Sequence, residues 1–327
     1  MKAAVIGTGL AAAALAEPLT QAGWQLSFFE KSRGTGGRMT TRRREGVYFD
    51  HGAQYFTART TQFQQFLKLY FEAGLVQEWT PRVQTLAPGA KPYKRLWYEP
   101  HYVCVPTMNS LCRTLLGEQS LHFQHRVESV RKSSRGWQVL FEEGGEVDGF
   151  DWVISTAPAS QTLDIFGSVA DELSEVKFEP GFALMGLLPH KPGWDAAVVK
   201  SSAIDWMVLA DARPGRPEAQ GLVAQATGPW SMQHLEEPPE RVQEALMQAL
   251  SDLNLQLSEP QLHRWRFARA IQPLGKDFWC DPDSGLAACG DWCLGNRVED
   301  AYTSAVALAR LLNQSRSDLC VAQLPAR

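Results

Sequence analysis

The sequence predicts an α/β protein in which a parallel sheet is combined with a second part of mixed α and β elements. The first 30 residues read as strand, helix and strand, the commonest opening of a parallel sheet. The last part, "GLAACGDWCLGNRVEDAYTSAVALARLL", reads as strand, loop and long helix. Between them, residues 165–283 change to several strand-like runs around one helix, which indicates the second part.

The residue types justify the opening unit. Residues 2–6 (KAAVI) form a short apolar run, as expected of a buried strand. The run rich in Ala and Leu that starts at Leu10 predicts a helix that ends at Gly23, because glycine is common just past a helix end. Residues 24–30 (WQLSFFE) then predict the second strand.

The later elements follow from hydrophobic periodicity. The spacing of Phe63, Phe66, Leu67 and Tyr70 predicts a helix over residues 60–73. A further helix is expected directly after Pro106, and residues 127–159 predict three strands joined by turns. More strands are expected at 181–188, 205–210, 222–227 and 262–270, with helices over 239–253 and after 297.

Composition excludes several classes of protein. The chain of 327 residues is 44% hydrophobic and 21% charged, which is ordinary for a globular protein. Its net charge of −4 gives no overall positive field, so we expect no nucleic-acid partner. The N-terminal apolar run is interpreted as a strand, not a secretory signal, because cleavage there would remove a glycine motif. No other run approaches the roughly 18 apolar residues of a membrane span, so no membrane partner is expected.

The cysteines point to a reducing compartment. None of the six stands in a CxxC pair, and none has metal-ligand spacing to another Cys or His, so we expect no metal site. A long chain of this kind needs no disulfide framework, which favours a cytoplasmic location.

Residues 7–12 (GTGLAA) match the pattern G-x-G-x-x-[G/A] between the first strand and the first helix. Gly7 allows the tight turn, Gly9 lets a diphosphate approach the backbone, and Ala12 is small enough for the helix to pack on the strand. Glu30 stands 21 residues after Gly9, at the end of the second strand, where a carboxylate accepts hydrogen bonds from a ribose. The pattern predicts a bound dinucleotide with free ribose hydroxyls, such as FAD or NAD.

A second glycine cluster follows Glu30 in the stretch "EKSRGTGGRM". It would be redundant for NAD, whereas FAD is longer and its diphosphate and ribityl chain extend past the first helix. Gly36, Gly37 and Arg38 would offer backbone N–H groups and a guanidinium to the phosphates. The three arginines at 42–44 are expected to form a solvated strand edge or turn.

Taken together, these motifs resemble the flavin amine oxidase superfamily, and within it the renalase-type proteins of bacteria. The resemblance rests on "KSRGTGGRM", "GAQYFTAR", "HRWRFARA" and "CGDWCLGNRVEDA", which span nearly the whole chain. The sequence departs from the family at His51, where a small or apolar residue is expected, and in "RWRFARA", which lacks the lysine that many amine oxidases place near the flavin. Cys289 and Cys293 are interpreted as buried cysteines and not as attachment points, so the FAD is expected to be non-covalent.

The resemblance implies which residues bind the cofactor and the substrate. The implied FAD ligands are Gly7, Gly9, Leu10, Ala11, Ala12, Glu30, Lys31, Gly36, Gly37, Arg38, Gln54, Tyr55, Val127, Gly290, Asp291, Arg297 and Val298. Aromatic walls for a flat substrate ring are expected from Tyr55, Trp206, Trp230, Trp265 and Phe267, with His234 as a polar contact. For each of these residues a place in the core, or on the surface for His234, stays open as the alternative.

The resemblance also implies the domain plan. A Rossmann-like FAD-binding domain with a parallel sheet and a β-meander is expected at residues 1–58, 102–164 and 284–327. An α+β substrate domain with a mixed or antiparallel sheet is expected at residues 59–101 and 165–283.

Three functions remain open. Renalase-type proteins oxidise misreduced dihydronicotinamides, 2- or 6-dihydro-NAD(P), to NAD(P)⁺ and pass the electrons to oxygen, giving hydrogen peroxide. The resemblance implies this activity first, with the flavin as hydride acceptor and no catalytic side chain assigned. The alternatives are a flavin-dependent oxidase or dehydrogenase of an amine or other small molecule, and a non-enzymatic FAD-binding protein.

Overall fold

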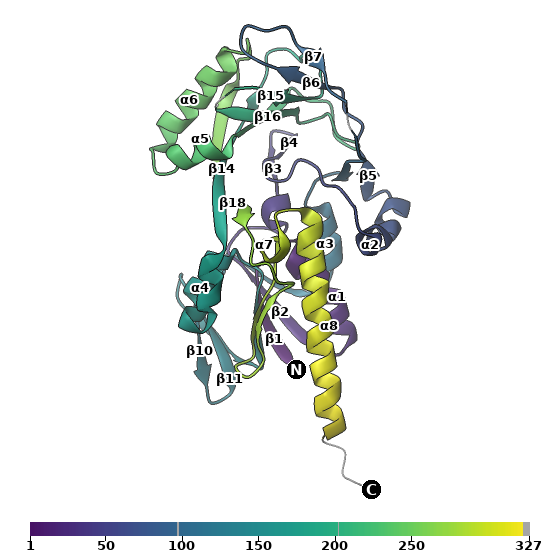
Figure 1. The fold of residues 1–327 in the computed structure, drawn as a ribbon, viewed down its shortest axis with the longest axis vertical. Coiled ribbons are helices and arrows are strands. Elements are labelled where there is room, and N and C mark those ends of the chain that lie inside the picture. The colour runs from purple at the N-terminus through teal and green to yellow at the C-terminus, as the bar shows by residue number, and fades with distance from the viewer. Residues whose placement is uncertain (97, 202, 323–327) are drawn as a thin grey trace. The chain divides into compact units, whose positions relative to one another are not determined.

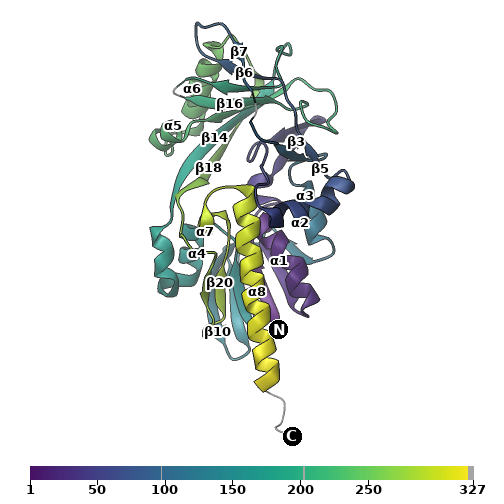
Figure 2. The ribbon, with the colours of Figure 1, turned by 45° about the vertical axis from the view of Figure 1, so that its right-hand side comes forward.

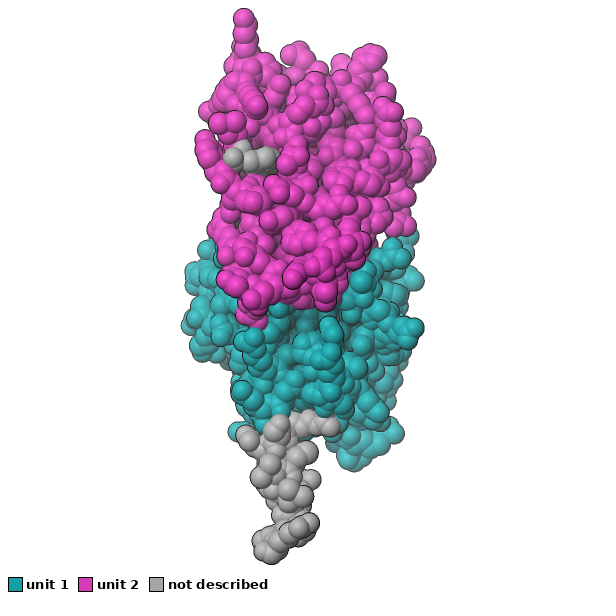
Figure 3. All heavy atoms as spheres, turned by 90° about the vertical axis from the view of Figure 1, so that its right-hand side faces the viewer, with its two compact units in different colours: residues 1–37, 112–177, 270–327 teal, residues 38–111, 178–269 magenta. Residues whose placement is uncertain are grey.

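The structure is a computed structural model that describes residues 1–96, 98–201 and 203–322, with side chains of the last helix described as far as residue 314. Figures 1 and 2 show its ribbon. Its contacts divide the chain into two compact units, coloured in Figure 3. Unit 1 comprises Met1–Gly37, Cys112–Lys177 and Ala270–Arg327, and unit 2 comprises Arg38–Leu111 and Phe178–Arg269. The domain ranges expected from the sequence concern cofactor and substrate binding, and they stay a prediction.

Unit 1 contains the predicted parallel sheet. Its strand order is β19-β20-β13-β1-β2-β9, and every neighbouring pair is parallel except β19 with β20. The strands are β1 (Lys2–Ile6), β2 (Gln25–Glu30), β9 (Ser120–Phe123), β13 (Trp152–Ser155), β19 (Trp279–Asp281) and β20 (Leu286–Ala288). The expected meander is also present, as the antiparallel sheet of β10 (Val127–Ser133), β11 (Gly136–Phe141) and β12 (Glu146–Phe150).

The helices of unit 1 follow the sequence analysis closely. Helices α1 and α8 pack side by side in both ribbon views, and Gly23 follows α1 with the positive φ of +80° expected of a residue just past a helix end. The helices are α1 (Leu10–Gln21), α4 (Ala159–Phe166), η2 (Gly167–Glu175), α7 (Asp291–Leu294) and α8 (Val298–Ala322), with α3 (Ser110–Leu116) at the boundary between the units.

One expected boundary was wrong, and one strand was missed. The helix after Pro106 begins only at Ser110, because residues 107–110 form a turn in which the Thr107 N–H donates to the Ser110 hydroxyl at 3.2 Å. The 127–159 segment contains four strands where three were expected: the last expected strand, WVIST, is present as β13, and Glu146–Phe150 forms the additional strand β12 in a different sheet. They separate at Asp151, whose N–H donates to the Lys2 carbonyl at 2.9 Å and whose carboxylate accepts from the Lys2 N–H at 2.7 Å.

Unit 2 is built on a mixed seven-stranded sheet in the order β18-β14-β17-β16-β15-β6-β7, where only β15 and β6 pair in parallel among the described pairs. The strands are β6 (Val83–Leu86), β7 (Tyr93–Lys94), β14 (Lys177–Leu187), β15 (Ala196–Val199), β16 (Ile204–Leu209), β17 (Gly221–Ala226) and β18 (Ser258–Gln272). This confirms the mixed sheet expected for the second part of the chain.

One face of this sheet is covered by helices. Met207 and Leu184 belong to a buried apolar cluster with Leu246 and Leu250 of α6 (Pro239–Ser251), so this face forms the core of unit 2. Since side chains alternate along a strand, Trp206 points to the opposite face. The remaining elements of unit 2 are η1 (Gly37–Met39), β3 (Thr41–Arg44), β4 (Val47–Asp50), α2 (Thr61–Glu72), β5 (Val76–Glu78), β8 (Tyr102–Cys104), α5 (Gly228–Gln233) and α6 (Pro239–Ser251).

Candidate functional site

The first glycine turn of unit 1 lies between β1 and α1. Gly7 has φ +99°, and a Cβ at this position would lie 2.6 Å from the Thr156 hydroxyl oxygen. Gly9 is the N-cap of α1 and provides no side-chain hydrogen bond to the first turn, which also contains no acidic residue. The first N–H groups of α1 therefore face no side-chain carboxylate of their own turn, as a bound diphosphate requires.

The second glycine loop packs directly on the first. The Gly36 N–H donates to the Thr8 carbonyl at 2.9 Å. Gly37 has φ +52°, and a Cβ added there would lie 3.3 Å from the Gly9 Cα. Since the two loops approach each other this closely through backbone alone, side chains are excluded from the space between them. The sequence analysis expected these loops to serve one ligand, and the structure brings them together.

Glu30 joins the glycine turn to the end of β2. Its Oε2 accepts from the Thr8 N–H at 3.1 Å and from the Thr8 hydroxyl at 2.9 Å. Its Oε1 accepts from the Ser32 N–H at 2.8 Å. The carboxylate is buried, with 7% of the residue exposed. It holds the loop in shape and still has lone pairs that a ribose hydroxyl could use.

An open cavity of about 630 Å³ lies beside Glu30 in unit 1. Its volume falls in the usual range for small-molecule sites. It is lined by Lys31, Ser32, Arg33, Gln124, Arg126, Glu142 and Glu143. Val127 begins β10 next to this wall and is buried at 7% exposure. The cavity is large enough for the nucleoside end of a dinucleotide.

The C-terminal segment supplies the last expected cofactor residues of unit 1. The Gly290 N–H donates to the Ser304 hydroxyl at 3.1 Å, and Asp291 is buried. Helix α8 begins at Val298, as expected, and the Asp300 carboxylate accepts from the Arg297 N–H at 2.9 Å and pairs with the Arg297 guanidinium at 3.1 Å. Asp300 therefore caps the start of this helix. The sequence analysis missed this feature, although an aspartate three residues after Arg297 could have indicated it.

The thiols beside this segment are deeply buried. Cys289 and Cys293 are both fully buried, and burial is the main cause that raises the pKa of Cys293 to about 12 and that of Cys289 well above its usual value. A thiol in this state is a poor nucleophile at neutral pH. Trp292 is also fully buried, and its indole N–H donates to the Ala157 carbonyl at 3.0 Å.

In unit 2, the irregular segment from Asp50 to Tyr55 is held by side chains. The Gln54 amide donates to the carbonyl oxygens of Asp50 (2.6 Å) and Gly52 (3.0 Å). Gln225 donates to the same Gly52 oxygen at 2.7 Å, and the Trp265 indole donates to the His51 oxygen at 2.9 Å. Gln54 was expected to bind the cofactor. In the structure its side-chain NH2 group donates hydrogen bonds within this segment.

Arg38 is tied to the same segment. Its carbonyl accepts from the Ala53 N–H at 2.8 Å, and a Cβ on Gly52 would lie 2.0 Å from that carbonyl oxygen. Its guanidinium is half-buried and donates to the Ala268 carbonyl at 3.4 Å. Only glycine is tolerated at position 52, so the backbone of Arg38 and the segment 50–55 form one rigid piece.

A buried charge cluster that the sequence analysis missed supports this segment. The side chains of Asp50, Arg213 and Arg216 are 0%, 0% and 1% exposed. Asp50 pairs with Arg216 at 2.6 Å and with Arg213 at 3.3 Å, and Arg213 donates to the Gln54 carbonyl and side-chain oxygens at 3.1 and 2.6 Å. Burial lowers the pKa of Arg213 to about 10. Because 163 residues separate Asp50 from Arg213, no local pattern could have indicated the pair.

Tyr55 lies in an aromatic group on the face of the sheet opposite α6. Its ring centroid lies 4.4 Å from that of His101, 5.7 Å from that of Trp206 and 6.1 Å from that of Trp79. Burial is the main cause of the raised pKa of Tyr55. The group brings together two expected substrate residues, Tyr55 and Trp206, and adds Trp79 and His101, which the sequence analysis did not name.

The other expected substrate residues lie in different parts of unit 2. Trp265 lies next to the segment 50–55, through its bond to His51. Trp230 packs against the apolar cluster beneath α6, and His234 stacks on it with a centroid distance of 4.0 Å. Phe267 contacts Phe178 at a centroid distance of 5.5 Å. Trp230 therefore lies with the core face of the sheet, which was its open alternative. His234, whose open alternative was the surface, is half-buried against Trp230.

His51, which is buried, and His263, which is half-buried, form an imidazole pair whose ring centroids lie 4.6 Å apart. The Arg42 guanidinium lies 3.4 Å from His263 Nδ1. Burial is the main cause that lowers the pKa of His51 to about 4 and that of His263 to about 3, and the nearby Arg42 charge adds to it. Both imidazoles are therefore neutral at physiological pH.

This pair predicts an acid-dependent loss of stability. Above pH about 6.5 both histidines are neutral in the folded and unfolded chain, so the stability is complete. As the pH falls to about 4, the unfolded chain binds protons that the folded chain excludes, and the free energy of unfolding drops by a few kcal/mol. Urea unfolding at several pH values measures this. The double variant His51→Gln/His263→Gln should flatten the curve in this window, and an unchanged slope would contradict the assignment.

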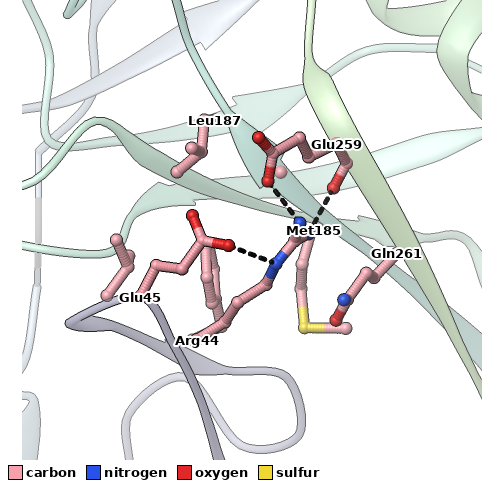
Figure 4. Close-up of a pocket in the computed structure, with 9 residues that line it drawn as sticks. Arg44, Glu45, Met185, Leu187, Glu259 and Gln261 are labelled. Carbon is pink, nitrogen blue, oxygen red and sulfur yellow. Dashed lines mark hydrogen bonds and ion pairs between the residues drawn. The ribbon is translucent and has the colours of Figure 1, made fainter.

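The three arginines after Arg38 do not form a solvated trio. Arg43 alone is exposed, whereas Arg42 lies at His263 and Arg44 is half-buried. Figure 4 shows Arg44 in a small pocket of about 70 Å³, where its guanidinium donates to the Glu259 carbonyl at 3.0 Å and pairs with the Glu259 carboxylate. The expectation was wrong because strand β3 alternates its side chains between solvent and β18, a partner far away in sequence.

Within the described ranges, no group of three or more His, Cys, Asp and Glu side chains is arranged to hold a metal ion. No helix in that part of the chain has the length and apolar character needed to cross a membrane.

Two family profiles match the sequence. The profile of the NAD(P)-binding Rossmann-like domain matches residues 5–70, and that of the flavin containing amine oxidoreductases matches residues 98–313. Mouse (Mus musculus) renalase is 24% identical over 296 residues, a match that covers 81% of this chain and 84% of renalase.

Solved structures share the fold at low sequence identity. A protein of Exiguobacterium sp. 255-15, provisionally assigned as a protoporphyrinogen oxidase, superposes with a TM-score of 0.75 at 12% identity and covers 96% of this chain and 99% of its own. An oxidoreductase from Methanosarcina mazei gives 0.68 at 15% identity, covering 95% and 100%. A fatty acid isomerase from P. acnes that produces CLA gives 0.69 at 10% identity, covering 94% and 98%.

Proposed function

The chain belongs to the family of flavin containing amine oxidoreductases, and from that premise we propose that it is an FAD-dependent oxidase of misreduced dihydronicotinamides. In this reaction 2- or 6-dihydro-NAD(P) loses a hydride and becomes NAD(P)⁺, and oxygen takes up the two electrons as hydrogen peroxide. The similarity to mouse renalase over 81% of the chain supports this substrate class over other substrates of the family.

The main support for a bound FAD is the glycine cradle of unit 1, which we define as the two loops that contain Gly7, Gly9, Gly36 and Gly37. Gly9 and Gly37 approach each other through backbone alone, and Gly36 bonds to Thr8, at an α1 N-terminus free of acidic side chains in its first turn. A diphosphate fits this chemistry, and the adjoining cavity beside Glu30 suits the adenosine of FAD. The cofactor supplies hydride acceptance when bound. The deep burial of Cys289 and Cys293 supports non-covalent binding.

The aromatic group around Tyr55 supports binding of a flat, apolar ring. Tyr55, Trp206 and Trp79 present ring faces and edges within one group, and the segment 50–55 that carries Tyr55 is fixed by hydrogen bonds from Gln54, Gln225 and other side chains. A rigid aromatic wall orients a dihydronicotinamide ring and excludes water from it. No acid or base of the chain is required for hydride loss from such a ring, because the nitrogen lone pair stabilises the cation that forms.

The cellular setting is part of the proposal. Among the described residues, Cys104, Cys112, Cys280, Cys289 and Cys293 are free thiols. This supports a reducing compartment such as the cytoplasm, where NAD(P)H and its misreduced isomers are present.

Product analysis tests the proposed function. Air-saturated protein incubated with 2- or 6-dihydro-NAD should give NAD⁺ and hydrogen peroxide in equal amounts. Primary amines offered in parallel should give no aldehyde or peroxide. Aldehyde and peroxide from amines, with the dihydronicotinamides left unchanged, would instead identify an amine oxidase, and inertness toward both would indicate a redox-silent flavoprotein.

Arg38 and Arg43 should differ in their effect on cofactor retention. Arg38 continues the second glycine loop, and its charge is half-buried, so Arg38→Ala should lower the flavin content of the purified protein several-fold. Arg43 is exposed beside the Tyr48 ring, with 5.2 Å from the guanidinium carbon to the ring centre, and Arg43→Ala should leave the content unchanged. The flavin-to-protein absorbance ratio measures both, and equal losses would show that the two arginines serve the same role.

A further inference from the structure

An exposed strip of basic and aromatic residues lies at the edge of the unit 2 sheet. We call it the basic–aromatic strip and define it as Lys91, Tyr93, Lys94, Arg95, Leu96 and Tyr98. The residues Tyr98, Leu96 and Tyr93 are 92%, 59% and 53% exposed, among the most exposed large side chains of the described residues. Part of the strip is β7, the edge strand of the sheet. Large exposed side chains gathered in this way mark interaction sites more often than scattered ones do.

The strip carries positive charge that the described part of the chain does not neutralise. From Trp79 to Tyr98 the sequence contains basic residues and no acidic residue, although the whole chain has a net charge of −4. Neighbouring cations are paired, since Arg82 bonds Asp195 at 2.6 Å and Arg59 bonds Glu99 at 2.7 Å. Among the described residues, no carboxylate forms a salt bridge with a cation of the strip. Lys200 adds a fourth cation, 5.7 Å from the Tyr93 ring centre.

The strip leads directly to the Tyr55 aromatic group. Within the strip, the Arg95 N–H donates to the Val83 carbonyl at 2.9 Å, which fixes the strip to β6. Arg95 is close enough to Tyr55 that its charge lowers the pKa of the phenol, against the larger effect of burial. His101 follows three residues after Tyr98, the last residue of the strip, and its ring centroid lies 4.4 Å from that of Tyr55. Three residues span at most about 10 Å, so the strip and the ring site are neighbours within unit 2.

We propose that the basic–aromatic strip binds the ADP portion of a dinucleotide substrate whose nicotinamide ring lies at Tyr55. This inference rests on the proposed function and adds to it the surface that holds the ADP portion of the dihydro-NAD(P) substrate. Lys94 and Arg95 offer charge-assisted hydrogen bonds to the diphosphate, and an exposed tyrosine ring such as Tyr98 offers a stacking surface for adenine. A different reading is that the lysines only protect a sheet edge from aggregation, and that reading predicts no ligand effect.

A comparison of two substrates tests the proposal. In the double variant Lys94→Ala/Arg95→Ala, the KM for 6-dihydro-NAD should rise about tenfold with little change in kcat, because two charge contacts to the diphosphate are lost. The KM for the corresponding dihydronicotinamide riboside, which lacks the ADP portion, should not change. Added salt should raise the KM of the wild-type protein for the dinucleotide only. An equal rise for both substrates, or no rise for either, would overturn the proposal.

A matched control and a binding measurement complete the test. Lys68→Ala/Arg241→Ala removes two exposed cations from α2 and α6 of the same unit and should leave both KM values unchanged. Calorimetric titration with ADP-ribose needs no turnover. If turnover fails but ADP-ribose binds to the wild type and not to Lys94→Ala/Arg95→Ala, the strip is supported and the proposed function is not. If turnover succeeds but ADP-ribose does not bind, the strip is refuted and the proposed function stands. Binding of the wild type to anionic vesicles in place of ADP-ribose would also refute it.

Discussion

Replacing Asp50 by alanine is expected to lower the free energy of unfolding by about 3–5 kcal/mol, the cost of leaving buried charges without their partner. Asp50 is the only carboxylate within 4 Å of the two buried guanidiniums of Arg213 and Arg216 among the described residues. It also accepts hydrogen bonds from the Thr41 hydroxyl and from the Met108 N–H. Urea unfolding followed by tryptophan fluorescence measures the loss.

An exposed ion pair provides the control for Asp50. Glu236 pairs with Arg266 at 2.5 Å, but its side chain is 69% exposed. Glu236→Ala should therefore leave the free energy of unfolding close to that of the wild type. A loss for Asp50→Ala as small as this would contradict the conclusion that the cluster is held together by its buried carboxylate. Since the cluster also fixes Gln54, Asp50→Ala should lower catalytic turnover in the protein that remains folded.

Replacing Gly7 by alanine is expected to lower flavin content strongly and to destabilise the fold by about 2–6 kcal/mol. A non-glycine residue at φ +99° carries backbone strain of about 1–3 kcal/mol. The new methyl group would lie 2.6 Å from the Thr156 hydroxyl oxygen, which is fixed by its own bond to the Ile6 carbonyl at 2.8 Å, and such overpacking costs about 1–3 kcal/mol. The flavin-to-protein absorbance ratio and the thermal midpoint measure the two effects.

Gly34 is the matched control for Gly7. It lies in the second glycine loop, and a Cβ there would meet nothing within 4 Å. Gly34→Ala should leave both flavin content and the thermal midpoint close to those of the wild type. If the two alanine variants behave alike, the turn at Gly7 does not depend on the absence of a side chain, and the cradle is wrongly assigned.

The sequence allowed the glycine cradle to be predicted because its parts are local. Strand, turn and helix follow one another within residues 2–21, and Gly23 ends the helix by its own conformational preference. Glu30 was located by its spacing from Gly9, and the contact between the two glycine loops follows once β2 lies beside β1. Each step depends on residues near in sequence, where pattern and structure agree.

The support of the segment 50–55 could not be predicted in this way. Asp50 meets Arg213, His51 meets His263, and Gly52 meets Gln225, and each pair joins different strands or loops of unit 2. An arginine or histidine carries no local sign of such a partner, because burial and pairing arise only when the sheet assembles. For the same reason, Arg42 and Arg44 were expected in solvent.

The aromatic residues illustrate a related limit. The sequence alone does not distinguish Trp206 from Trp230 as a binding residue, since either can fill a core or line a site. The structure separates them through strand register: Met207 faces the α6 cluster, so its neighbour Trp206 faces away, while Trp230 packs on that cluster. Which face of a strand is core depends on the helices that cover it, and no pattern within the strand itself contains this information.

Rapid anaerobic mixing of the purified flavin-loaded protein with 6-dihydro-NAD tests the central claim most directly. We predict that the absorbance of the oxidised flavin disappears in a single turnover, with a single equivalent of NAD⁺ formed per flavin, and returns when oxygen is admitted. Flavin that stays oxidised in the presence of 2- and 6-dihydro-NAD, or that is reduced only by amines, would contradict the account.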